Sequence, residues 1–112
     1  MCEAVIDLCS ALFNISGRDL RSHRRCSQDV ARVRQIAMYL CNTTLGLSLT
    51  AIGMAFGRDR TTVGHAVQLI EDLRDAAEFD AIMEQAERIV VAAFYHRGGA
   101  PWLSGQNRMA KR

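Results

Sequence analysis

The chain has 112 residues and a formal net charge of +2, with 49% hydrophobic and 23% charged residues, an ordinary globular composition. This length suffices for one hydrophobic core and leaves no room for a nucleotide-binding domain beside it. The phosphate-loop pattern G-x-x-x-x-G-K-[ST] occurs nowhere in the chain, so we expect no ATPase or other enzymatic activity and no bound cofactor.

The N-terminal residues do not resemble a secretory signal, because Glu3 and Asp7 stand where basic and then apolar residues would be needed. We therefore expect a cytoplasmic protein with reduced thiols. The four cysteines show neither a C-x-x-C pair nor zinc-finger spacing, and the single H-x-x-C of His23 and Cys26 is a weak signal, so no metal site is expected. Cys9 and Cys41 lie on apolar helical faces and are predicted to be core thiols.

In chain order, apolar spacing predicts a first helix through Val5 and Leu12 that ends near Asn14 to Gly17, with Ser16-Gly17 as its stop. A polar loop follows over residues 17–28, with room for one helical turn at Asp19 and Leu20. A long helix is then expected from about Gln28 to Leu45. Its apolar stripe comprises Val30, Val33, Ala37, Leu40, Cys41 and Thr44. Three further apolar residues, Ile36, Met38 and Tyr39, lie off this stripe, so the helix should be covered on more than one side at the centre of the fold.

The uncharged run from Gln35 to Gly57 is long enough to span a bilayer by count. Polar residues and two glycines, Gly46 and Gly53, interrupt it. Two buried helices and a turn explain this run better than a membrane span.

Residues 48–68 read as two short helices joined by a turn with a glycine, the layout of a helix-turn-helix DNA reader. One stripe of the second helix is apolar and can pack: Val63, Ala66, Val67, Ile70 and Leu73. The opposite face can touch DNA: Thr61, Gly64, His65 and Gln68. Asp59 is a good N-cap, which places Arg60, Thr61 and Thr62 in a first turn that favours a phosphate. An ordinary helical hairpin with a solvated face is the alternative reading of this pattern.

The second helix is expected to continue to about Ala77, and a last helix follows it. The apolar face of this last helix comprises Phe79, Ile82, Met83, Ala86, Ile89, Val90 and Ala93. Glycines and Pro101 argue against a regular element in the segment 96–112, which we expect to be a flexible basic tail after a DNA-binding domain of residues 1–95. Trp102 either docks this tail on the domain or serves a protein partner.

Charge is segregated along the chain. Residues 18–34 carry six arginines against two aspartates, a balance of +4, whereas residues 71–88 carry seven acids against two arginines, a balance of −5. One side of the molecule should therefore attract phosphates while the other repels them.

These features together resemble the C-terminal DNA-binding domain of the bacterial replication initiator family DnaA, over roughly residues 4–95. The resemblance rests on Arg24-Arg25, on the run Val30 to Met38, on Ser48-Leu49 with Ile52-Gly53 and Ala55 to Gly57, and above all on the block Arg58-Asp59-Arg60-Thr61-Thr62-Val63-Gly64-His65-Ala66. It implies an all-helical single domain with a helix-turn-helix and double-stranded DNA as the partner.

The resemblance also implies residue roles. Arg60, Thr61 and His65 would enter the major groove, and Asp59 would accept from a cytosine amino group or hold a neighbouring arginine. Backbone contacts are implied for Arg25, Arg32, Arg34, Gln35, Leu49, Thr50 and Thr62, with Arg24 and Gln68 completing the expected DNA-binding set.

Four positions depart from the family pattern. Gly57 stands alone where two glycines are usual, Arg60 replaces a histidine, Cys26 replaces an arginine that enters the minor groove, and Asn42 replaces a lysine that contacts phosphate. From the pattern and the resemblance together, we expect a sequence-preferring DNA-binding protein that regulates bacterial transcription, or replication at initiator-like boxes. The alternative is a helical protein-interaction module that has lost tight DNA binding. The sequence leaves monomer and dimer equally open.

Overall fold

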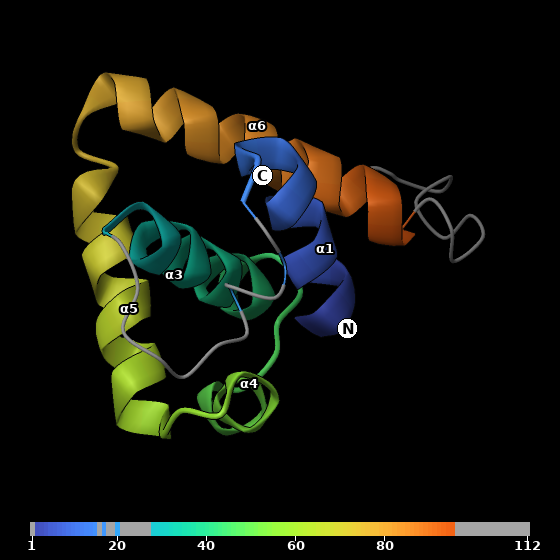
Figure 1. The fold of residues 1–112 in the computed structure, drawn as a ribbon. Coiled ribbons are helices and arrows are strands. Elements are labelled where there is room, and N and C mark those ends of the chain that lie inside the picture. The colour runs from blue at the N-terminus through green and yellow to red at the C-terminus, as the bar shows by residue number, and fades with distance from the viewer. Residues whose placement is uncertain (1, 16, 18–19, 21–27, 96–112) are drawn as a thin grey trace.

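The computed structural model describes residues 2–15, 17, 20 and 28–95, and these residues form helices without a β-strand. The helices are α1 (Cys2–Phe13), α3 (Gln28–Thr43), α4 (Leu49–Phe56), α5 (Arg60–Leu73) and α6 (Ala77–Tyr95). Figure 1 shows α3 in the middle, α5 and α4 along one side and the bottom, and α6 across the top, where it meets α1. The expected all-helical fold with a helix-turn-helix is confirmed.

Helix α3 is the centre of the core, as its two-sided apolar pattern predicted. Every residue from Val33 to Cys41 is buried except Gln35. The off-stripe residues Ile36, Met38 and Tyr39 are each no more than 3% exposed. A helix that is apolar on several sides must pack against several partners, and here α1, α4 and α5 all contact α3.

The thiols predicted to lie in the core do so. Cys9 and Cys41 are fully buried, and Cys2 is buried beside them. Burial away from water disfavours the thiolate, which raises the pKa of Cys9 to about 12 and also raises the pKa of Cys41. Within the described part of the chain, no cluster of His, Cys, Asp and Glu side chains is arranged to hold a metal ion. The His23 and Cys26 pair lies outside that part.

Several helix boundaries differ from the prediction. The first helix ends at Phe13, just before the range Asn14 to Gly17 that we expected, and Asn14 adopts the left-handed conformation with φ 56°. Ser16 of the expected stop lies outside the described residues. Helix α3 ends at Thr43, two residues early, because the Leu45 N–H turns back to the Leu40 carbonyl and Gly46 takes φ 73°. The uncharged run is thus divided between α3 and α4, and no described helix is long and apolar enough to cross a membrane.

Two expectations for the C-terminal half were wrong. Helix α5 ends at Leu73 rather than near Ala77, because residues 74–76 form tight turns that bond back to residues 70–73. On α6, Met83, Ala86 and Val90 are buried as predicted, but Ile82 is 48% exposed. The apolar face of α6 is therefore wider than the surface that covers it.

Candidate nucleic-acid interface

The two helices of the helix-turn-helix are held by local caps. The Ser48 side chain accepts a hydrogen bond of 3.0 Å from the Ala51 N–H at the start of α4. At the end of α4, Gly57 adopts φ 69° and its N–H returns to the Gly53 carbonyl. A single glycine at position 57 therefore suffices to reverse the chain into α5.

Close backbone approach sets the angle between α4 and the turn. The Arg58 N–H donates to the Gly53 carbonyl at 2.9 Å, and a Cβ atom placed on Gly53 would lie 2.5 Å from the Arg58 carbonyl oxygen. Real Cβ atoms do not approach a backbone oxygen so closely, so only glycine fits here without a shift of the turn. Gly53 therefore helps to set the orientation of α5 relative to α4.

Asp59 caps α5 as predicted. Its side-chain Oδ1 accepts a 2.8 Å hydrogen bond from the Thr62 N–H, and its backbone is extended at φ −80°, ψ 165°. The hydrogen bond from the Thr62 backbone lowers the pKa of the Asp59 carboxyl. The cap uses one of the free N–H groups of the first turn, and the positive end of the helix dipole remains directed toward solvent.

The outward face of α5 carries side chains that suit DNA contact. Arg60, Thr61, Thr62, His65 and Gln68 are all exposed. At about 100° per residue, Thr61, His65 and Gln68 fall on one stripe, directed away from the buried Val63 and Ile70. Gln68 donates to Asp72 at 3.0 Å, so its amide is already engaged along the helix.

Gly64 lies closer to the protein than the sequence suggested. It is half-buried, and a Cβ at this position would lie 3.6 Å from Leu49 Cδ1. Leu49 itself is half-buried at the start of α4 and packs against the core, whereas Thr50 beside it is exposed. Of these two expected backbone contacts on α4, Thr50 is thus the more accessible.

The expected phosphate contacts on α3 are engaged within the protein. Arg34 is only 7% exposed, and its Nε donates a 2.8 Å hydrogen bond to the Leu20 carbonyl. Arg32 donates to Gln35 Oε1 at 3.1 Å, and both side chains are half-buried. Arg24 and Arg25, together with the departure at Cys26, lie outside the described residues.

An open pocket of about 240 Å³ lies between α3 and α5 and gathers several of the expected contact residues. Its polar lining comprises Arg34, Gln35, Arg58, Thr62 and His65. This volume is below the roughly 300–1,000 Å³ of a typical small-molecule site. Arg58 was missing from the expected contact set, although its place immediately before the Asp59 cap could have indicated it.

The departure at Asn42 has a structural counterpart. Its side-chain amide donates to the Leu47 carbonyl at 2.9 Å and so fastens the loop between α3 and α4. Asn42 is half-buried and serves the fold at this position.

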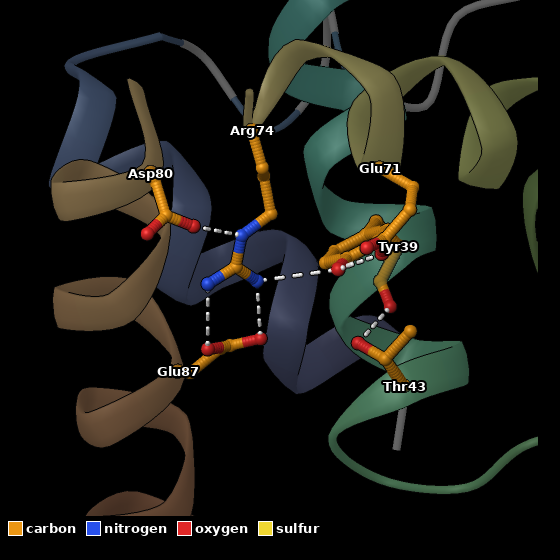
Figure 2. A network of polar contacts seen from close by, with 6 residues as sticks. All are labelled: Tyr39, Thr43, Glu71, Arg74, Asp80 and Glu87. Carbon is orange, nitrogen blue, oxygen red and sulfur yellow. Dashed lines mark hydrogen bonds and ion pairs between the residues drawn. The ribbon is translucent and has the colours of Figure 1, made fainter. Parts of the chain in front are cut away.

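The acidic segment lies at the other end of α5 from the capped N-terminus (Figure 1). There the Arg74 guanidinium joins α5 to α6 and α3 (Figure 2). It donates to Asp80 Oδ1 at 2.6 Å, to Glu87 Oε2 at 2.8 Å and to the Tyr39 hydroxyl at 3.2 Å. The Tyr39 hydroxyl in turn donates to Glu71 Oε1 at 2.6 Å.

Burial opposes the charge of Arg74, but hydrogen bonds to Glu87, Asp80 and Tyr39 outweigh that cost and raise the pKa of its guanidinium. Two of the seven acids in residues 71–88 are therefore paired with Arg74. The remaining acids belong to the last turn of α5, the turn that follows it and α6.

Comparison with known proteins agrees with this geometry. The family model described as the bacterial DnaA protein helix-turn-helix matches residues 2–70. The chromosomal replication initiator protein DnaA of Rhodopseudomonas palustris (strain BisA53) is 51% identical over 73 residues, which are 62% of this chain and 15% of that protein. The DnaA proteins of Bartonella quintana and Brucella abortus are 52% and 50% identical over 62 residues, or 54% of this chain and 12% of each relative.

The chain thus spans less than a sixth of the length of these relatives. The matched residues 2–70 include α1, α3, α4 and most of α5, with the capped turn between α4 and α5. This chain belongs to the bacterial DnaA helix-turn-helix family.

Proposed function

We propose that this chain binds double-stranded DNA with a sequence preference and regulates bacterial transcription, or replication through initiator-like boxes, without an ATPase of its own. The observation that carries the proposal is the capped N-terminal half of α5, where Arg60, Thr61 and His65 are exposed together. A helix presented by such a turn enters the major groove with its first residues against base edges. The site of action would be the bacterial nucleoid in the cytoplasm.

In this proposal the side chains divide between reading and positioning. Arg60 can pair with guanine O6 and N7, and the Thr61 methyl can meet a thymine methyl. Thr50, Thr62 and the pocket around Arg58 would hold phosphates and set the register. Glu71 and Asp72 limit the contact to the first turns of α5, because their carboxylates repel the DNA backbone.

The proposal is tested by titrating the protein into labelled duplexes over a range of salt concentrations. If about four to six phosphates are neutralised, log K falls against log salt with a slope of roughly −4 to −5, because each contact contributes about −0.9. A slope near zero, or no binding at low salt, overturns the proposal.

Two arginine variants separate base recognition from non-specific attraction to the DNA backbone. Arg60→Ala should lose about 1 to 3 kcal/mol on the preferred site, selected from random duplexes, and should flatten discrimination between sites. Arg88→Ala removes one exposed positive charge from α6, away from α5's N-terminus, and should leave the discrimination unchanged. If both variants lowered affinity and discrimination equally, α5 would not be the helix that recognises the bases.

The departure at Arg60 gives a second test of specificity. Because histidine is usual at this position in the family, Arg60→His should shift the preferred base toward that of the initiators. A selection from random duplexes with each protein measures this shift. An unchanged preference would remove Arg60 from the reading set.

A specific observation favours the alternative function as well. The side chain of Asn42, where the family has a phosphate-binding lysine, is bonded to Leu47 within the protein. If no duplex binds at low salt, a protein-interaction module that kept the helix-turn-helix scaffold becomes the better reading.

A further inference from the structure

An apolar groove lies between the last turn of α1 and the middle of α6, where the two helices meet in Figure 1. The groove measures about 160 Å³ and is lined by Leu12, Phe13, Ile82, Gln85, Ala86 and Ile89. Leu12 is 40% exposed and Ile82 is 48% exposed, so apolar surface is left uncovered on both walls. The groove is smaller than a typical ligand site of about 300–1,000 Å³, but it suits one or two inserted side chains.

The segment that follows α6 has the composition to fill this groove. Residues 96–112 lie outside the described part of the chain, and they include the adjacent apolar residues Trp102 and Leu103. Trp102 is the only tryptophan of the protein. Gly98 and Gly99 precede it, and glycines permit the chain reversal that a return toward α6 requires.

The segment is also long enough. Trp102 is the seventh residue after Tyr95. A fully extended chain of seven residues spans up to about 23–25 Å. Measured along α6 at about 1.5 Å per residue, Ile89 lies about 9 Å and Ile82 about 20 Å before Tyr95. Trp102 can therefore reach the Ile89 end of the groove with a turn in the chain, and the Ile82 end only when the chain is nearly fully extended.

Charge favours the same partner. The segment carries Arg97, Arg108, Lys111 and Arg112 and no acidic residue. Helix α6 carries four acids and one arginine; Asp80 and Glu87 pair with Arg74, and both Glu78 and Glu84 are exposed. A basic segment lying along α6 is attracted by these carboxylates, with a strength that salt reduces.

We propose that Trp102 and Leu103 of the C-terminal segment bind the groove between α1 and α6, with the basic residues of the segment over the acidic surface of α6. Insertion covers the exposed parts of Leu12 and Ile82. The groove lies at the end of the domain opposite to α4 and the N-terminus of α5 (Figure 1), so a segment bound there would hold its cations away from the candidate DNA surface.

The test uses the fluorescence of Trp102 in the full chain, excited selectively over the two tyrosines. In the folded protein we expect emission shifted to the blue of the unfolded chain and reduced quenching by acrylamide. Ile82→Ser should move both measurements toward the values of the unfolded chain. Because Ile82 is half exposed, this substitution removes little core contact, and circular dichroism verifies that the helices persist.

Val91→Ser is the matched control. Val91 is an exposed apolar residue of the same helix, but nine positions from Ile82 correspond to about 180° around α6. The control should leave emission and quenching unchanged. Equal effects of both variants, or wild-type emission equal to that of the unfolded chain, would overturn the proposal. A blue shift that disappears on dilution together with a doubled mass would assign the groove to a second copy and would also overturn it.

Discussion

Arg34 and Leu20 are joined by a hydrogen bond of 2.8 Å from the guanidinium Nε to the backbone carbonyl oxygen, in surroundings where Leu20 is fully buried. This bond ties Leu20 to α3, the helix that lines one side of the candidate interface. Arg34 therefore stabilises the fold in addition to any contact that it makes with phosphate.

Arg34→Lys separates these two roles. Lysine keeps the positive charge but lacks the Nε–H donor, so the buried Leu20 carbonyl loses its partner. We expect a loss of about 1–3 kcal/mol in the free energy of unfolding, measured with urea. Arg60→Lys, at an exposed position, is the control and should stay within about 0.5 kcal/mol of wild type. Equal stability of the two variants would contradict the structural role of Arg34.

Two glycines of the helix-turn-helix should respond in opposite directions to the same substitution. Gly53→Ala places a Cβ 2.5 Å from the Arg58 carbonyl oxygen and should destabilise the protein by about 1–3 kcal/mol, as overpacking does. Gly64→Ala meets only Leu49 Cδ1 at 3.6 Å and should stabilise α5 by about 0.5–1 kcal/mol through its better helix propensity. The melting temperatures of the two variants, compared with wild type, test both signs. A higher melting temperature for Gly53→Ala would contradict the close approach of Gly53 to Arg58.

The Arg74 network should contribute measurable stability. Arg74→Met leaves the carboxylates of Asp80 and Glu87 without their partner, and we expect a loss of about 1–3 kcal/mol. The value stays modest because these carboxylates are 37% and 29% exposed and water compensates them in part. Arg88→Met, an exposed arginine of α6, should change the unfolding free energy by less than about 0.5 kcal/mol. Indistinguishable denaturant midpoints for the two variants would refute the prediction.

The Asp59 cap should make stability depend on acid pH. The folded protein holds the pKa of this carboxyl below its ordinary value of 3.8, so the folded state favours the charged form. The stabilisation is therefore fully present above pH 3.8 and is lost as the pH falls through the lower pKa of the folded state. Asp59→Asn keeps a good capping side chain but cannot titrate.

We expect the difference in unfolding free energy between wild type and Asp59→Asn to shrink as the pH is lowered below 3.8. Urea unfolding at a series of pH values measures the difference. A constant difference across the series would show that the charge of Asp59 does not contribute to the cap.

The sequence by itself determined the features that depend on near neighbours in the chain. The helical spacing of apolar residues placed the helices, Asp59 and Gly57 marked the turn into α5, and the two-sided apolar pattern of α3 identified the centre of the core. Each of these signals acts within a few residues, because caps, left-handed turns and helical faces are local properties of the backbone. The block Arg58 to Ala66 was the most specific part of the resemblance that indicated the family.

Only the tertiary structure decided how distant elements use their side chains. Arg34 looked like a phosphate contact, yet it is only 7% exposed and its Nε donates to the Leu20 carbonyl oxygen. Arg74 entered the sequence reading only as one cation of the acidic segment 71–88, yet the turn after α5 directs it to Asp80 and Glu87 on α6. Ile82 has the spacing of a core residue but lies beyond the surface that α1 covers. These outcomes depend on which helices meet and at what distance, and spacing along one helix carries no information about its partner.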